Sequence, residues 1–178
     1  MDTPDPRPLR GEPISLDLLN SRWHDDVLFR EYDGLPIWLA SNGLAERVPP
    51  TDAVLAALLD TRAALLALRA DPTDTAPLNA VLAHGSVRRT LAADGTPHDE
   101  PDVPDLTWLP AWLAADDYLR LLSLGPERIR ECAHERCILT FFDVSQNGRR
   151  RWCSMADCGN RAKAARHYSH QKQNTLPG

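Results

Sequence analysis

Apolar residues recur at helical spacing along much of the first 125 residues. The clearest stretch, residues 51–70, is rich in alanine and leucine and follows a helix start signal, Pro49-Pro50-Thr51, with Thr51 as the N-cap. Asp71-Pro72 ends it, because proline cannot continue a helix. The same spacing and end signals predict further helices over residues 35–43, 76–84 and 106–124.

Shorter apolar runs predict strands. Residues 14–20 (ISLDLLN) form a run whose length favours a strand over a buried helical turn. Residues 86–92 and the segment after Asp94-Gly95 predict a hairpin, because Asp-Gly is a favoured hairpin turn, although prolines interrupt the second strand. We therefore expect an α+β fold, with a mainly helical N-terminal domain that has a small strand component.

Gly125-Pro126 breaks the chain just before the first cysteine and predicts the domain boundary. Residues 1–12 are predicted to be a flexible leader, 13–125 the first domain and 126–178 a small second module. The chain contains no run of about 18 apolar residues and no secretory signal, so we expect it in the cytoplasm, away from membranes. Cysteine clusters there bind metal more often than they form disulfides.

The four cysteines form two pairs of equal spacing, Cys132-x4-Cys137 and Cys153-x4-Cys158. Zn²⁺ takes four tetrahedral ligands, and two ligand pairs joined by a hairpin-length spacer supply them. This pattern favours a zinc site over a disulfide or redox pair and over free thiols. Four thiolates leave no open coordination position, so the zinc would be structural and not catalytic.

The residues around the cysteines predict a knuckle, a hairpin and a helix, an order typical of a treble-clef-like zinc finger. Residues 138–143 (ILTFFD) predict a strand, Asn147-Gly148 a turn and residues 149–153 the return strand. Residues 155–172 predict a helix, whose N-terminal dipole would favour the thiolates of the second cysteine pair.

The net charge of −5 hides an asymmetry. Residues 1–126 hold 10 Lys and Arg against 20 Asp and Glu, whereas residues 127–178 hold 10 against 5. A basic module suggests an anionic partner, with cations on phosphates and helix residues at base edges. One or two flanking arginines, Arg151 and Arg161, could instead stabilise the thiolates. The predicted nucleic-acid contacts are Arg149, Arg150, Arg151, Asn160, Arg161, Lys163, Arg166, His167 and His170.

Residues 150–163 (RRWCSMADCGNRAK) resemble the CGNR zinc-finger family, which is named after a motif found here at residues 158–161. The first cysteine pair, the segment 141–145 (FFDVS) and a basic tail over residues 166–172 belong to the same family motif. Residues 15–20 and 35–44 resemble the ABATE domain, which usually precedes this finger. The resemblance implies a bacterial, stress-related transcription regulator with the finger as its DNA-binding part.

The leading hypothesis is a zinc-dependent, DNA-binding transcription regulator. An RNA-binding protein and a zinc-stabilised protein-interaction module are the alternatives. A finger of this size needs a homodimer or a second contact for specific affinity. Asp17 and Asn20, polar residues in an apolar run, are candidate contacts to a small-molecule effector, with backbone capping as the competing explanation. No spacing of acid, base or nucleophile indicates an enzyme.

Overall fold

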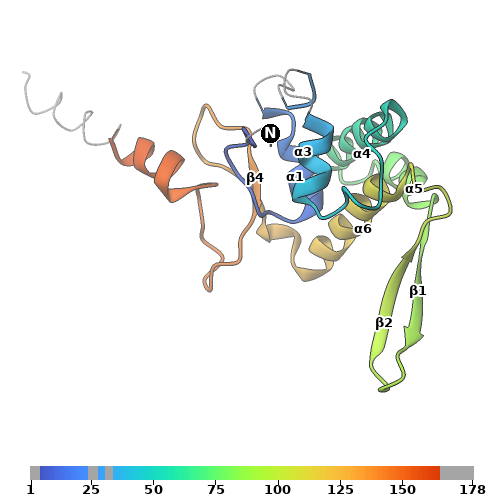
Figure 1. The fold of residues 1–178 in the computed structure, drawn as a ribbon. Coiled ribbons are helices and arrows are strands. Elements are labelled where there is room, and N and C mark those ends of the chain that lie inside the picture. Colours follow the sequence, from blue (N-terminus) through green and yellow to red (C-terminus); the bar gives the residue numbers. More distant parts are fainter. Residues whose placement is uncertain (1–4, 24–27, 31–33, 165–178) are drawn as a thin grey trace, which may run out of the picture.

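The computed structural model describes residues 5–23, 28–30 and 34–164, which form a helical body, a projecting hairpin and a cysteine-containing finger (Figure 1). No helix in these ranges is long and apolar enough to span a membrane. The body comprises helices α1 (Ile14–Asn20), α3 (Gly34–Ser41), α4 (Asp52–Ala70), α5 (Ala76–Leu82) and α6 (Leu109–Leu124). The hairpin is β1 (Ser86–Leu91) with β2 (Pro97–Asp102), and the finger contains η1 (Pro126–Arg128), β3 (Ile129–Glu131), β4 (Thr140–Phe142) and η2 (Met155–Gly159). The α+β fold class is confirmed.

Helix α4 forms as its sequence predicts. The Thr51 side chain caps the first turn by accepting a hydrogen bond from Val54 N at 3.3 Å. Val54, Leu58 and Leu65 lie on its buried face, at the four- and seven-residue steps expected of a helix against a core. Helices α1, α5 and α6 pack around α4, so these apolar faces meet in one core.

The strand predicted for residues 14–20 is wrong, because this segment is helix α1. It begins after Pro13, and its next six residues, 15–20, are all buried. A helix buried on every side has no polar face to reveal its period, so its sequence reads like a buried strand. As a helix, α1 contacts both α6 and α4 and reaches β4 of the finger.

The predicted hairpin is confirmed, including its proline-containing second strand. β1 pairs antiparallel with β2 from Ser86↔Asp102 to Leu91↔Pro97. The turn closes through a hydrogen bond from Ala92 N to Thr96 O at 2.9 Å, with Gly95 at a φ of 81° that favours glycine. The hairpin projects from the body, and most of its residues are exposed (Figure 1).

In the finger, the strand predicted within residues 138–143 is confirmed as β4, but its partner is not the predicted return strand 149–153. β4 pairs instead with β3, which precedes the first cysteine. The returning chain is held by the Asp143 carboxylate, which accepts from Arg150 N at 2.9 Å, and by one backbone bond from Ala133 N to Arg151 O at 2.8 Å. The Asp143 side chain thus binds the backbone that was expected to pair with β4 as a return strand.

Candidate metal centre

Two loops bring the four cysteines together. Cys132 and Cys137 lie in the connection between β3 and β4, which is closed by hydrogen bonds from Cys132 N to Leu139 O and from Cys137 N to His134 O, both 2.9 Å. Cys153 ends the returning loop, and Cys158 lies in the first helical turn beyond it. That turn is a wide π turn whose N-cap, Ser154, accepts from Asp157 N.

The four Sγ atoms all lie within 4.8 Å of one another. The Sγ atom of Cys153 is 3.7 Å from those of Cys137 and Cys158. A tetrahedral Zn²⁺ with bonds of about 2.3 Å places its sulfur atoms roughly 3.8 Å apart, whereas a disulfide bond is about 2.05 Å long. All four thiols are free, and three are buried. The cluster therefore has the donor chemistry and the spacing of a four-thiolate zinc site.

The thiols influence one another strongly. Burial, together with the charges of Cys137 and Cys132, raises the pKa of Cys153, and burial raises the pKa of Cys158 to about 11. Burial acts in the same direction on Cys132, but N–H donors, including Cys153 N at 3.4 Å from its sulfur, lower its pKa overall. Four thiolates this close together require a cation, so metal binding here releases protons.

A buried carboxylate organises the loop that carries Cys153. Asp143 has no exposed surface and accepts hydrogen bonds from Ser145 N and Arg150 N, both at 2.9 Å, with Arg130 Nη1 at 3.5 Å. Although burial acts to raise its pKa, these donors lower it to about 2. The role of this aspartate was not predicted, although it lies in the FFDVS segment of the family motif.

The Arg150 side chain is half-buried and makes most of its contacts within the finger. Its guanidinium lies 4.2 Å from the centre of the Phe141 ring and donates to the backbone carbonyls of Trp152 and Cys153. It also approaches Glu12 of the body at 3.6 Å. These contacts fix the backbone next to Cys153, so Arg150 supports the cysteine cluster.

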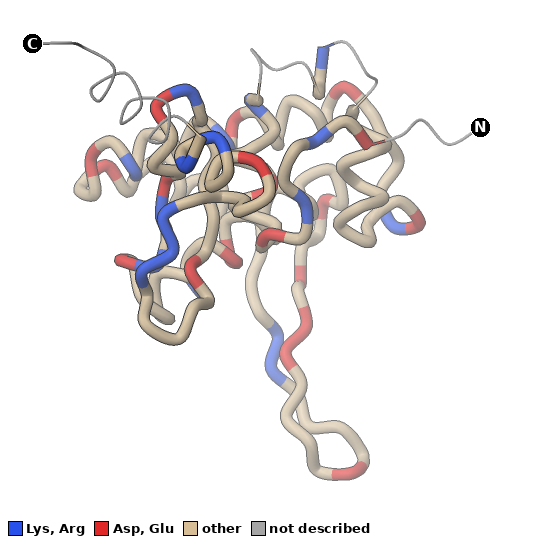
Figure 2. The backbone as a smooth tube through the Cα atoms, turned by 90° about the vertical axis from the view of Figure 1, so that its left-hand side faces the viewer, with Lys and Arg blue, Asp and Glu red and all other residues tan. Residues whose placement is uncertain are grey.

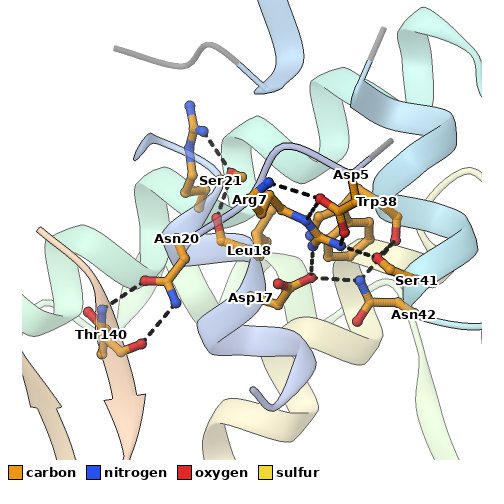
Figure 3. A network of polar contacts seen from close by, with 11 residues as sticks. Asp5, Arg7, Asp17, Leu18, Asn20, Ser21, Trp38, Ser41, Asn42 and Thr140 are labelled. Atoms are coloured by element: carbon orange, nitrogen blue, oxygen red, sulfur yellow. Dashed lines mark hydrogen bonds and ion pairs between the residues drawn. The ribbon is translucent and has the colours of Figure 1, made fainter. Parts of the chain in front are cut away.

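The outer edge of β4 is paired with side chains of the body and not with another strand. Asn20 donates from Nδ2 to Thr140 O and accepts from Thr140 N, both at 2.8 Å (Figure 3). Glu12 continues the pairing by accepting from Phe142 N at 2.9 Å. Burial raises the pKa of Glu12 despite this hydrogen bond. Two side chains from the start of the chain therefore act as a substitute strand for the finger.

Replacing Asn20 by alanine is expected to lower the free energy of unfolding by about 2–3 kcal/mol, because the N–H and C=O of Thr140 lose their partners in a buried place. Urea unfolding of the full chain measures this. The matched control is Asn79→Ala on the exposed side of α5, where a change within about 0.5 kcal/mol is expected. Equal effects of the two substitutions would contradict the substitute-strand interpretation.

Asp17, another polar residue of α1, belongs to a buried cluster of charges (Figure 3). Its carboxylate accepts from Arg7 at 2.5 Å and from Asn42 Nδ2 at 2.8 Å, and Arg7 also pairs with Asp5 at 2.7 Å. Burial raises the pKa of Asp17 in spite of these partners. The contacts made by Asp17 and Asn20 are structural, and a role for either in effector binding stays a prediction.

The predicted nucleic-acid contacts are placed in three ways. Arg150 is half-buried and contacts Phe141 and the backbone of the finger, as described above. The tail residues Arg166, His167 and His170 lie outside the described residues. The remaining side chains are exposed around the cysteine cluster: Arg149, Arg151, Asn160, Arg161 and Lys163.

A helical body joined to a finger with four clustered thiols defines a zinc-finger protein. Residues 12–125 match the family model of the ABATE domain, described as a putative stress-induced transcription regulator, and the chain belongs to this family. Residues 128–171 match the model of the CGNR zinc finger. Both resemblances noted in the sequence are thus confirmed. A search of curated proteins found no match.

Proposed function

We propose that this protein is a DNA-binding transcription regulator, and that Cys132, Cys137, Cys153 and Cys158 hold a structural Zn²⁺ that shapes its DNA-binding surface. The observation that supports this most directly is the position of the exposed cations. Arg149 and Arg151 precede Cys153, and Arg161 and Lys163 follow Cys158. A metal bound by both cysteines links the loop to the helix, so it would hold both sets of cations in one arrangement.

The side chains at this surface suit phosphate contact. The Arg151 guanidinium lies 5.2 Å from the centre of the Trp152 ring, which restrains its direction. Asn160 is tied to its own helix by a hydrogen bond from Nδ2 to Ala156 O at 3.1 Å. Figure 2 shows acidic segments spread through the body and its hairpin. We therefore place the DNA at the finger, with phosphates neutralised by arginine and lysine.

Exchanging Arg149, Arg151 and Arg161 together for glutamine is expected to weaken binding of the full chain to duplex DNA at least tenfold in about 0.1 M salt. The slope of log affinity against log salt should flatten by about 2–3, since each lost phosphate contact removes roughly 0.9. Fluorescence anisotropy with a mixed-sequence duplex measures both quantities.

The matched control removes three exposed arginines of the body, Arg30, Arg47 and Arg120, by the same exchange. It should leave the salt slope unchanged. Binding that does not depend on salt, or equal losses in the two triple variants, would overturn the proposed surface. Competition with single-stranded and duplex RNA tests the RNA alternative. If the protein is an RNA-binding protein, unlabelled RNA should release it from the labelled duplex, whereas unlabelled DNA should release it far less.

A further inference from the structure

Within the described part of the chain, neither outer edge of the hairpin β1–β2 pairs with another strand. Among residues 5–23, 28–30 and 34–164 it is a two-stranded sheet, and it projects from the helices (Figures 1 and 2). Val87 is 44% exposed and Leu91 73% exposed. A two-stranded hairpin alone is only marginally stable in water, so an added strand would stabilise it.

The turn of the hairpin establishes which backbone groups point outward. Ala92 N donates to Thr96 O, so the N–H and C=O of Ala92 face β2. In an antiparallel pair the direction alternates from residue to residue, so Val87, Arg89 and Leu91 direct their backbone groups away from β2. The corresponding outward positions on β2 are their register partners: Pro101, Asp99 and Pro97.

The two edges therefore differ in their capacity to accept a strand. On β2, Pro97 and Pro101 remove two of the three outward N–H donors, a common protection of sheet edges. On β1, Val87, Arg89 and Leu91 each offer an outward N–H and C=O. Strand addition is blocked at β2 and open at β1.

We propose that β1 pairs with β1 of a second copy of this chain, antiparallel and about a twofold axis at Arg89. In this register Arg89 faces Arg89 of the other copy, and Val87 faces Leu91 on both sides. The outward groups then meet as hydrogen-bonded pairs along the whole strand. Apolar residues face each other on the same side of the new sheet, with Pro97 and Pro101 beside them.

The two central arginines repel each other in this arrangement, but each brings its own counter-charge. Arg89 donates to both carboxylate oxygens of Asp99, at 2.8 and 3.0 Å. The twofold thus joins two neutral pairs and not two bare cations. Arg88 is likewise paired with Glu100 at 2.5 Å. A strand of an unrelated protein would need to carry a matching neutralised charge between two apolar residues. A second copy of this chain has that arrangement by symmetry.

Sedimentation equilibrium of the full chain, reduced and supplied with zinc, tests the proposal. We expect a dimer whose dissociation constant rises about 10- to 100-fold in Arg89→Pro, because both central N–H donors are lost. Proline fits the hairpin at this outward position, as it does on β2. The matched control is Arg89→Gln, which also breaks the Arg89–Asp99 ion pair but keeps the outward N–H of residue 89, and which should remain dimeric.

Cysteine cross-linking gives a second readout that does not depend on the stability of the proline variants. Paired residues at the axis have Cα atoms about 5.5 Å apart, within disulfide range, so Arg89→Cys should form a covalent dimer on mild oxidation. Asp99→Cys, about three strand spacings or roughly 14 Å from its copy, should not. A monomeric wild type, an Arg89→Pro variant as dimeric as the wild type, or equal cross-linking of the two cysteine variants would overturn the proposal. A monomer that binds an extended peptide at β1 would identify a different protein as the partner.

Discussion

Replacing Cys153 by serine is expected to reduce the zinc content from about one ion per chain to near zero. The Cys153 sulfur lies 3.7 Å from two of the other three sulfurs and is buried among them. A hydroxyl there leaves three thiolates around a metal that takes four ligands. Structural zinc supplies on the order of 10 kcal/mol of apparent folding free energy, so the finger should unfold when the metal is lost. Elemental analysis of protein purified under reducing conditions measures the zinc, and amide hydrogen exchange reports the unfolding.

The neighbouring serine provides the control for this substitution. Ser154 caps the helical turn by accepting from Asp157 N at 3.3 Å, so Ser154→Ala should cost about 1 kcal/mol of stability and leave the zinc bound. Full zinc retention in Cys153→Ser would contradict the proposed ligand set. A wild type without zinc, with its thiols oxidised or freely titratable, would favour redox chemistry instead.

Replacing Asp143 by alanine is expected to lower the free energy of unfolding by about 3 kcal/mol, although the residue holds no metal. The substitution leaves the N–H groups of Ser145 and Arg150 without their acceptor inside the finger. It also releases the loop before Cys153, so zinc affinity should fall. Urea unfolding measures the first effect and competition with a chromogenic chelator the second.

Asp157→Ala is the matched control for Asp143→Ala, since it removes an exposed aspartate of the same finger. It should change stability by no more than about 0.5 kcal/mol and leave zinc affinity unchanged. If Asp143→Ala behaved like this control, the carboxylate would have no organising role.

The body helices were predictable because their signals are local. Thr51 and Pro72 delimit α4 from either side, and the apolar residues between them follow one helical period. The cysteine cluster was predictable for the same reason, since its ligands come in two closely spaced pairs. Helix α1 was not, because it is buried on all sides and has no solvent-facing side that its polar residues could mark.

The contacts that attach the finger to the body could not be predicted from local patterns. Asn20 and Thr140 are 120 positions apart, and a single asparagine in an apolar run carries no sign of its partner. The return strand was predicted wrongly for a related reason. An Asn-Gly turn followed by polar residues suits a hairpin, but a buried aspartate binds the backbone that a strand would have bound.

The contact between Asn20 and β4 also limits when the fold can be completed during synthesis. Residue 20 leaves the ribosome long before residue 140 does, so Asn20 must await its partner while the rest of the body is synthesised. Contacts of such sequence separation form late and slow folding. A nascent body released without its finger would carry an unpaired amide on α1, and a finger expressed alone would have an open strand edge. Cutting the chain near residue 126 would therefore leave unpaired polar groups on both products.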